Sequence, residues 1–497
     1  MNYLAIAMLS VMSGSVSAAI NTASGLEALN DQELAAETGQ ALFNMSYIAP
    51  TDATNLMNGK NNAGTSVGSV GFYKLGLEGE LELNTNIRNL QVGCGGVNGA
   101  DGCDIDIKNL ALSGLPDGGS YNNLGVPTPN GGYDVDGNPV FLNGRASTSA
   151  KLTNPFMEFA IKNPGSAATR EVLGFRLSAE KISGLLTAGL LNNAGPTTTD
   201  GIQSLSGFMR VAATTGDVVT KPVTFGKRPN EQIQGLLNAL NINRTFTSQP
   251  TDPDTKGVTV PSINPTFSLP AFQVNGSRNT QAVATGIKAT INSIPLDAGP
   301  LNQLKVTFPA LLLGIGSEAK IKLKAGSRVD NLNLDITFNQ ALSMIHNIPL
   351  TGTGGYLALQ NQNILWPGSY VDSTDASKND LSLMTKTDIA RAGWWMSFAD
   401  PVQLGYLKAT DPVNISSALP QIASLMTTEL LKEQNRVYVP SGDAISTLFG
   451  TVIETPNPIV VDLNAATTLN PARITLGNIQ LRNQTVVPNC YGTLKFC

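Results

Sequence analysis

One short phrase recurs four times along this chain and constrains its fold more than any other feature. It reads apolar-x-Asn-apolar-x-apolar, and its copies are IRNLQV (87–92), IKNLAL (107–112), VDNLNL (329–334) and LGNIQL (476–481). The apolar residues on the two sides of the Asn differ in parity, so a strand with one buried face must take a one-residue step there. Asn tolerates the left-handed backbone that suits such a step. The phrase predicts strand segments joined by bulges, and its irregular spacing does not support a solenoid of one fixed period.

A second strand signal begins at Leu75, where apolar and polar residues alternate. One parity carries Leu75, Leu77, Leu81, Leu83 and Ile87, and the other carries Glu78, Glu80, Glu82 and Asn84. This alternation predicts one long half-buried strand whose glutamates form the solvent face rather than a pair of catalytic carboxylates.

Helical patterns are few. Residues 231–240 form one candidate, and 417–434 form a longer one with Pro420 in its first turn. A short helix is expected near the N-terminus, where Asn30 and Glu33 fit a capping box and Gly39 a C-terminal stop.

The predicted fold is therefore mainly β and elongated, with long antiparallel strands, bulges, a short N-terminal helix and one longer helix at about 417–434. Whether the strands form a sandwich, a barrel or a solenoid stays open. The expected segments are a signal peptide (1–18), a helical segment (19–45), a β-rich domain (46–255) and a second β-rich domain with the helix (256–497).

Charge and reactive side chains are scarce. Charged residues make up 14% of the chain against roughly 25% in average proteins, and the formal net charge is -5 without runs of like charge. This composition argues against a nucleic-acid partner. The single histidine, His346, and only four cysteines exclude most zinc, haem and Ser-His-Asp sites.

An export signal is expected at the N-terminus. Residues 4–12 are apolar, and Val16-x-Ala18 fits a signal-peptidase site, although the first three residues carry no Lys or Arg. The longest later apolar run, 310–315, is too short for a membrane helix. The sequence predicts an exported protein without a helical membrane anchor, placed at the cell surface or outside the cell, with the periplasm or outer membrane as the alternative.

The cysteines are predicted to form two local disulfides. Cys94 and Cys103 flank a Gly-rich loop, and Cys490 and Cys497 flank the last residues. An exported protein would pair each cysteine with its near neighbour. Neither pair has the Cys-x-x-Cys spacing of a zinc site.

No catalytic residue is predicted. Residues 64–68 (GTSVG) match a nucleophile elbow around Ser66, but a strand before and a helix after it are missing, and the base would have to be His346. An exported hydrolase is thus the least favoured class. His346 sits among apolar neighbours and is interpreted as structural.

Two acidic loops offer the oxygen ligands that Ca²⁺ prefers. They contain Asp101, Asp104 and Asp106, and Asp134 and Asp136. Solvated turns are the favoured interpretation, with calcium as the minority hypothesis and no other cofactor or metal expected.

Three segments carry a family resemblance. Residues 29–41 (LNDQELAAETGQA), 104–110 (DIDIKNL) and 490–497 (CYGTLKFC) resemble exported surface proteins of Gram-negative bacteria, some of them similar to products of pilus-assembly (Fil-type) gene clusters. The resemblance implies a surface or filament role and carries no catalytic residues.

The predicted function is that of a non-enzymatic exported surface or fibre-associated structural protein. Its uncharged strand faces and open edges would engage pilus-assembly proteins, other surface proteins or a further copy of the chain. The alternative is a periplasmic or outer-membrane protein that binds an apolar ligand between strand faces.

Overall fold

The computed structural model describes most of the chain between residues 43 and 479. The described ranges are 43–114, 149–191, 195–225, 228–249, 257–296, 302–309, 318–350, 355–402, 412–416, 419–439, 452–462 and 472–479, with single positions at 352, 404, 407, 408, 484, 486 and 489. The expected signal peptide, the expected helix near residue 30, and the Cys490–Cys497 pair lie outside these residues.

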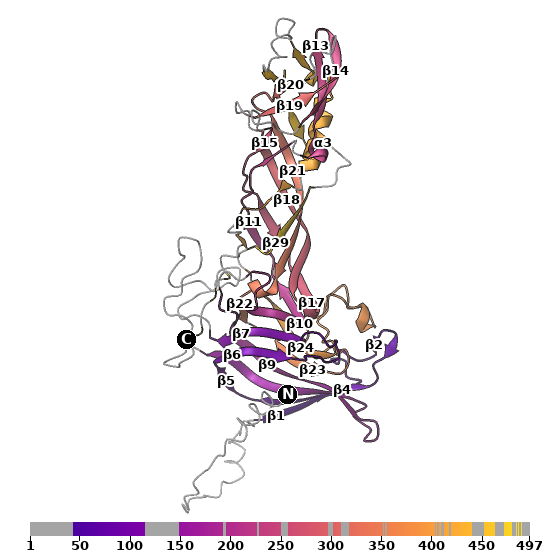
Figure 1. Cartoon of the computed structure of the whole chain (residues 1–497). Coiled ribbons are helices and arrows are strands. Elements are labelled where there is room, and N and C mark those ends of the chain that lie inside the picture. Colours follow the sequence, from indigo (N-terminus) through magenta and orange to yellow (C-terminus); the bar gives the residue numbers. More distant parts are fainter. Residues whose placement is uncertain are drawn as a thin grey trace, which may run out of the picture. The chain divides into compact units, whose positions relative to one another are not determined.

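The protein is mainly β, as predicted, and twelve strands form its largest sheet. These are β1 (Phe43–Ile48), β4 (Val70–Leu77), β5 (Glu80–Leu83), β6 (Thr85–Val92), β7 (Ile105–Ser113), β8 (Ala150–Lys162), β9 (Glu171–Ala188), β10 (Gly201–Val211), β17 (Phe272–Asn279), β22 (Asn347–Leu350), β23 (Tyr356–Gln360) and β24 (Gly393–Val402). The main order is β1-β4-β8-β9-β23-β24-β10-β7-β6, and β7 also pairs with the end of β9. The strands β9, β23, β24, β10 and β7 therefore form a closed ring of pairings, from which β8, β4 and β1 extend to an open edge (Figure 1).

A four-stranded sheet contains the longest ribbon of the second half. Its strands are β18 (Gln281–Pro295), β21 (Arg328–Ala341), β28 (Val460–Asp462) and β29 (Ala472–Gly477). Strand β18 follows β17 directly, and its pairing with β21 runs from Gln281↔Ala341 to Pro295↔Arg328. One face of this ribbon is buried, because Val329, Leu332, Leu334, Ile336 and Phe338 all lie in the main core.

The remaining strands form smaller sheets. A six-stranded sheet contains β13 (Gln234–Ala239), β14 (Ile242–Ser248), β19 (Gln303–Thr307), β20 (Glu318–Lys322), β26 (Val437–Val439) and β27 (Val452–Glu454). The others are β11 (Thr214–Asp217) with β16 (Thr266–Leu269) and β25 (Leu407–Lys408), β12 (Val223–Thr224) with β15 (Thr259–Val260), and β2 (Asn61–Asn62) with β3 (Thr65–Ser66). Short 3-10 turns are η1 (Pro229–Glu231), η2 (Leu342–Met344), η3 (Leu381–Leu383) and η5 (Glu433–Asn435).

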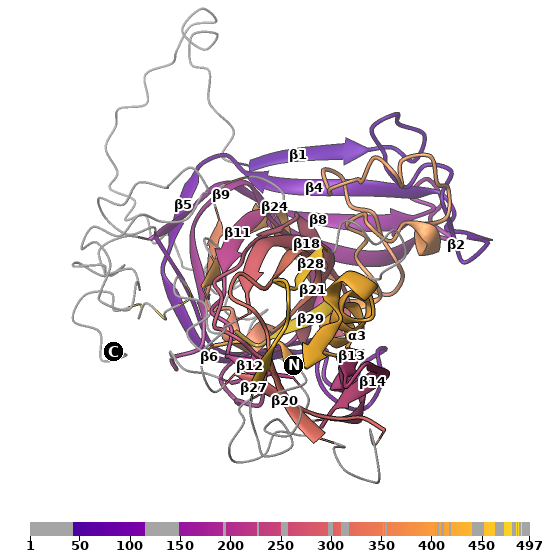
Figure 2. The same ribbon diagram turned by 90° about the horizontal axis from the view of Figure 1, so that it is seen from above.

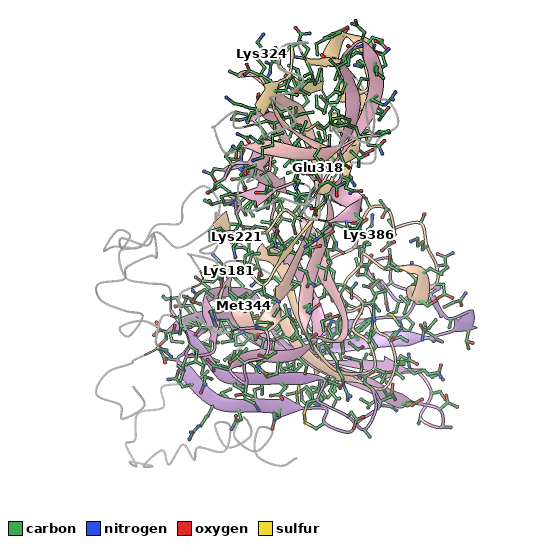
Figure 3. The ribbon with its side chains drawn as sticks, turned by 45° about the horizontal axis from the view of Figure 1, so that its top comes forward. Lys181, Lys221, Glu318, Lys324, Met344 and Lys386 are labelled. Carbon is green, nitrogen blue, oxygen red and sulfur yellow. A yellow bond between two sulfur atoms is a disulfide. The ribbon has the colours of Figure 1, made fainter. Side chains whose placement is uncertain are left out.

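Charged side chains lie mostly outside and apolar ones inside. Lys181, Lys221 and Glu318 are exposed, whereas Met344 is buried (Figure 3). Buried apolar side chains form two clusters: a main core that links the ring, the β18–β21 ribbon and the six-stranded sheet, and a second cluster around Trp366 and Trp395 on the large sheet. Seen from above, β1, β4 and β8 lie next to one another on the side of the sheet away from β6 (Figure 2).

The longer predicted helix is confirmed. Helix α3 spans Leu419–Leu430, and Ile422, Met426 and Leu430 are buried on one face. Pro420 lies in the first turn, where its missing N–H costs no hydrogen bond.

The other central helix prediction, residues 231–240, is wrong. Only η1 ends there, and β13 follows with alternating burial over Gln234–Ala239. Strand β13 pairs with β14 on one side and with β26 on the other. Pairing on both sides, with the strand that follows directly and with the distant β26, therefore overrides the local helical pattern.

The long strand expected from Leu75 to Ile87 is also wrong as one element. The chain breaks twice, at Glu78-Gly79 and at Asn84, and gives β4, β5 and β6. Glu78, Glu80 and Glu82 are exposed, as predicted. The expected boundary near residue 255 does not separate two sheets, because β10 pairs with both β17 and β24.

The left-handed Asn is present in three of the four copies of the phrase, but the predicted bulge is wrong for two of them. The β18–β21 register is unbroken from Ile287↔Ile336 to Pro295↔Arg328, and the β6–β7 register is unbroken from Thr85↔Leu112 to Val92↔Ile105. Asn109, Asn331 and Asn478 have φ values of 54°, 56° and 49°. In β21 the buried parity moves from Val329 to Leu332 across Asn331. In β6 the side-chain parity also shifts, but the left-handed residue is Asn109 of the paired strand β7 rather than Asn89.

Candidate functional site

One face of the large sheet carries apolar side chains across six neighbouring strands. The register places Tyr47 of β1 opposite Tyr73 of β4, and Tyr73 opposite Phe159 of β8. Phe159 is in turn opposite Phe175 of β9. Ring centroids are 4.4 Å apart for Tyr47 and Tyr73 and 6.4 Å apart for Phe159 and Phe175.

The same face contains two more apolar rows beside the aromatic one. We call the following set the apolar face: Tyr47, Tyr73, Phe159, Phe175, Leu359 and Trp394; Met45, Leu75, Met157, Leu177, Leu357 and Met396; and Phe43, Leu77, Pro155 and Ala179. None of these residues is charged. The set follows from strict alternation in each strand, since side chains at i and i+2 share a face.

Exposure rises along the apolar face toward the edge of the sheet. At the inner end, Leu357, Trp394 and Met396 pack against the main core. At the outer end, the exposed fractions are 45% for Leu75 and 79% for Met45. The apolar face thus continues the main core outward, and its side chains become exposed to solvent at β4 and β1.

Strand β1 is the end of this sheet. It pairs with β4 from Phe43↔Leu77 to Ile48↔Phe72, and no other strand among the described residues pairs with it. Within the described part of the chain, its outer edge is thus an open one, a feature that proteins usually mask with charge, proline or a bulge. Residues 43–48 (FNMSYI) contain none of these protections.

The opposite face of the sheet is covered and contains a buried carboxylate. Asp388 accepts hydrogen bonds from the Tyr356 hydroxyl (3.0 Å), the Trp395 indole N–H (3.2 Å) and the Ser397 hydroxyl (2.6 Å). Burial raises the pKa of the Asp388 carboxyl to about 6, and these hydrogen bonds limit the rise. Burial, together with the nearby Asp388 charge, raises the pKa of the Tyr356 hydroxyl well above its ordinary value.

A buried ion pair lies beside this carboxylate. Arg176 of β9 contacts Glu158 of β8 at 2.7 Å, and the two side chains are 6% and 2% exposed. Arg176 also donates to the Pro367 carbonyl and lies over the Trp366 ring. Burial raises the pKa of Glu158, while the Arg176 charge opposes that rise. All of these polar groups are engaged with one another, so the arrangement fits a structural role under the covering segment.

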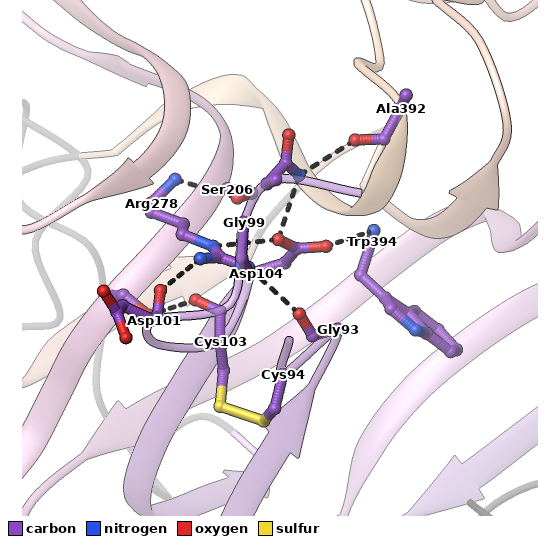
Figure 4. A network of polar contacts seen from close by, with 12 residues as sticks. Gly93, Cys94, Gly99, Asp101, Cys103, Asp104, Ser206, Arg278, Ala392 and Trp394 are labelled. Atoms are coloured by element: carbon purple, nitrogen blue, oxygen red, sulfur yellow. Dashed lines mark hydrogen bonds and ion pairs between the residues drawn. A yellow bond between two sulfur atoms is a disulfide. The ribbon is translucent and has the colours of Figure 1, made fainter. Parts of the chain in front are cut away.

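The predicted disulfide Cys94–Cys103 is present, and an ion pair between the buried Asp104 and the partly buried Arg278 fixes its loop (Figure 4). Arg278 of β17 donates from Nε to Asp104 (3.1 Å) and from its terminal nitrogens to the carbonyls of Gly93 and Gly99 and, closest of all, Asp101.

The carboxylate of Asp104 has two further donors besides Arg278. It accepts from the Asn98 amide (2.9 Å) and the Trp394 backbone N–H (3.0 Å). These contacts tie the loop to β24 as well as to β17.

The calcium candidates are therefore placed as follows. Asp104 is fully buried in its ion pair, Asp101 is exposed, and Asp106 pairs with Lys108 at 2.9 Å. Asp134 and Asp136 lie outside the described residues. Among the residues that are described, no group of three or more His, Cys, Asp or Glu side chains has the arrangement of a metal site.

The nucleophile-elbow hypothesis also lacks its geometry. Ser66 lies in β3, the second strand of a hairpin whose two strands have two residues each. Its hydroxyl accepts a hydrogen bond from the Gly68 N–H. His346 is buried, with Nδ1 2.8 Å from the Ala188 carbonyl, and burial lowers its pKa. The structural interpretation of His346 agrees with this environment.

Sequence reasoning missed the apolar face, Asp388 and the paired arginines Arg176 and Arg278. A signal for one pair was present: Glu158 and Arg176 are single charges between apolar neighbours, in FMEFA (156–160) and GFRL (174–177). A lone charge in an apolar strand indicates a buried partner.

In comparisons with known proteins, no family model, no curated protein and no solved structure matches this chain. Within the described residues, no helix has both the length and the apolar character needed to span a bilayer.

Proposed function

We propose that this chain is a non-enzymatic exported structural protein of the cell surface, associated with fibres such as pili, and that it contacts partner subunits through the apolar face. The observation that carries the proposal is the uncharged apolar face itself, which ends at the open edge strand β1. Contiguous exposed apolar surface on a folded protein marks an interaction site, and Phe43, Met45, Tyr47 and Leu75 form such a surface on β1 and β4.

Two further features support the proposal. The disulfide Cys94–Cys103 fits an oxidising compartment outside the cytoplasm. The groups around Asp388 and Asp104 are held by hydrogen bonds within the fold, and they fit supports of the sheet better than reacting groups.

The test combines location with a variant pair. Antibody labelling of intact cells and electron microscopy should place the protein on the surface, and deletion of the chain should reduce fibres or alter the envelope. Complementation with Leu75→Lys should fail, whereas Val283→Lys should restore the wild-type appearance, because Val283 is equally exposed (46% against 45%) but lies on β18, outside the apolar face. Protein confined to soluble periplasm, with no envelope change on deletion, would overturn the proposal.

The alternative function, binding of an apolar ligand, has less support. A pocket beside the β18–β21 ribbon is lined mainly by apolar side chains, including Ile291, Leu334, Ile336 and Val413, but its free volume is only about 10 Å³. That is roughly the space one water molecule needs, whereas ligand pockets are typically about 300–1,000 Å³.

A further inference from the structure

We propose that the open edge of the large sheet is occupied by a second copy of this chain, whose β1 pairs antiparallel with β1 across a two-fold axis at Met45. The inference rests on the proposed function and names the partner at the same surface.

The first argument is the symmetry of β1. From residue 43 to 47 the side chains are aromatic, polar, Met, polar and aromatic (FNMSY). An antiparallel pairing centred on Met45 places Phe43 opposite Tyr47 of the second copy and Asn44 opposite its Ser46. Each residue therefore meets a side chain of its own class, and cross-strand aromatic pairs are favourable in sheets.

The second argument is the direction of the faces. With a two-fold axis perpendicular to the sheet, Phe43, Met45 and Tyr47 of both copies point to the same side. The aromatic row that begins at Tyr47 and Tyr73 then meets the row of the second copy, and the apolar face becomes continuous across the dimer. No charged residue of β1 opposes this contact, although each chain has a formal net charge of -5.

The third argument is where the exposure lies. Met45 is 79% exposed, whereas Met157 and Leu177 of the same row are only partly exposed. A strand added beside β1 would cover the flank of this most exposed side chain, so lateral pairing adds cover where the apolar face has least of it.

The opposite end of the sheet order offers a contrast. Strand β6 carries the exposed charge of Arg88 and the exposed amides of Asn86 and Gln91. Such side chains discourage edge pairing. The two end strands thus differ in the manner expected if only β1 is an assembly edge.

Cysteine cross-linking of the full chain tests the register. Facing residues of antiparallel strands have Cα atoms about 4.5–5.5 Å apart, within the range that a disulfide spans. Met45→Cys should therefore give a covalent dimer under mild oxidation. Ser46→Cys is the matched control, because Ser46 is exposed on the same strand but faces Asn44 of the second copy, so little cross-linking is expected. The wild-type chain gives the background from its own cysteines.

Sedimentation provides the second measurement. The wild type should be dimeric at micromolar concentration, and Met45→Glu, which places two like charges opposite each other, should shift it to monomer by at least tenfold in the dissociation constant. A monomeric wild type, or cross-linking of Ser46→Cys as strong as that of Met45→Cys, would overturn the inference.

The two proposals fail separately. If the chain is monomeric yet its surface phenotype depends on Leu75, the apolar face meets a different partner and only this inference falls. If the β1 dimer forms but deletion leaves the cell surface unchanged, the proposed function falls and the dimer stands.

Discussion

At the scale of single residues, asparagines in left-handed conformation move the buried side of a strand from one parity to the other. Asn331 donates to Asp462 (2.9 Å), Asn109 donates to Asp200 (2.8 Å), and the Asn478 side-chain oxygen accepts from the Ala341 N–H (2.9 Å). The residue thus provides both the backbone conformation and a bond to a neighbouring segment. An amide side chain suits this double role, because it combines a donor and an acceptor.

Replacing Asn331 tests the backbone part of this role. Val at this position should lower the free energy of unfolding by about 2 kcal/mol, because left-handed backbone is costly for a β-branched residue. Gly removes the side-chain bond but keeps the conformation, so Asn331→Gly should cost about 1 kcal/mol or less. Urea unfolding measures both, with Asn333→Val, two residues further along the same strand, as control. Equal losses for the Val and Gly variants would contradict the prediction.

The buried carboxyl of Asp388 should make stability depend on pH. Its pKa is about 6 in the folded chain against an ordinary value of 3.8, so the unfolded chain releases this proton at lower pH. The contribution to stability is full below about pH 4 and is lost as pH rises through about 6, a change on the order of 2–3 kcal/mol.

Urea unfolding of wild type and Asp388→Asn at about pH 4 and about pH 7 measures this effect. The variant should lack the loss between the two pH values, whereas carboxylates that the two proteins share cancel in the comparison. An unchanged pH difference in the variant would assign the effect to other groups.

Single residues were predictable where the pattern is local and not where the partners are far apart in the sequence. The Asn phrase is local, and three of its copies have the left-handed Asn. The Asp388 group was not predictable, because Tyr356 lies 32 residues away and no pattern in the chain links the two. Arg278 and Asp104 are 174 residues apart, and only the pairing of β10 with both β7 and β17 brings them together.

At the scale of elements, a prediction succeeds where the stabilising pattern lies within one segment and fails where the contacts come from other strands. Helix α3 was predictable since its buried residues recur at helical spacing within one segment. Strand β13 was not, because its conformation depends on β14 and β26, and β26 begins about 200 residues later. The apolar face was hidden for a similar reason: alternation in β4 gave the shared face of Leu75 and Leu77 but not its lack of cover.

The ion pair of Arg278 and Asp104 connects the disulfide loop to β17 and should be a major contribution to the stability of this region. Arg278→Gln leaves a carboxylate with no exposed surface without its cation, and should cost about 3–5 kcal/mol in urea unfolding. The double variant Asp104→Asn/Arg278→Gln should be more stable than the single Arg278 variant, because it removes the unpaired charge. A double variant that loses the sum of both single losses would show that the two residues act independently.

At the scale of the whole molecule, the large sheet combines a closed part with an open part. The ring of β9, β23, β24, β10 and β7 leaves no free edge of its own, while β8, β4 and β1 continue outward to an unprotected strand. Closure of a sheet removes edges, and an open apolar edge promotes association. The architecture leaves β1 and β6 as the two end strands of the main order, and only β6 carries a charged side chain. The apolar face, which ends at β1, also contains no charged residue.

This arrangement predicts how the purified protein behaves as a whole. An apolar dye such as ANS should bind the native chain, and sulfate should strengthen its association, because excluded salts favour burial of apolar surface. Leu75→Lys should reduce both effects severalfold, while Val283→Lys, with nearly the same exposure on β18, should leave both unchanged. Both variants should change the free energy of unfolding by less than about 1 kcal/mol, as is usual for exposed positions. If the two lysine variants lose dye binding equally, the dye binds to scattered surface residues. The apolar face is then not the site of association.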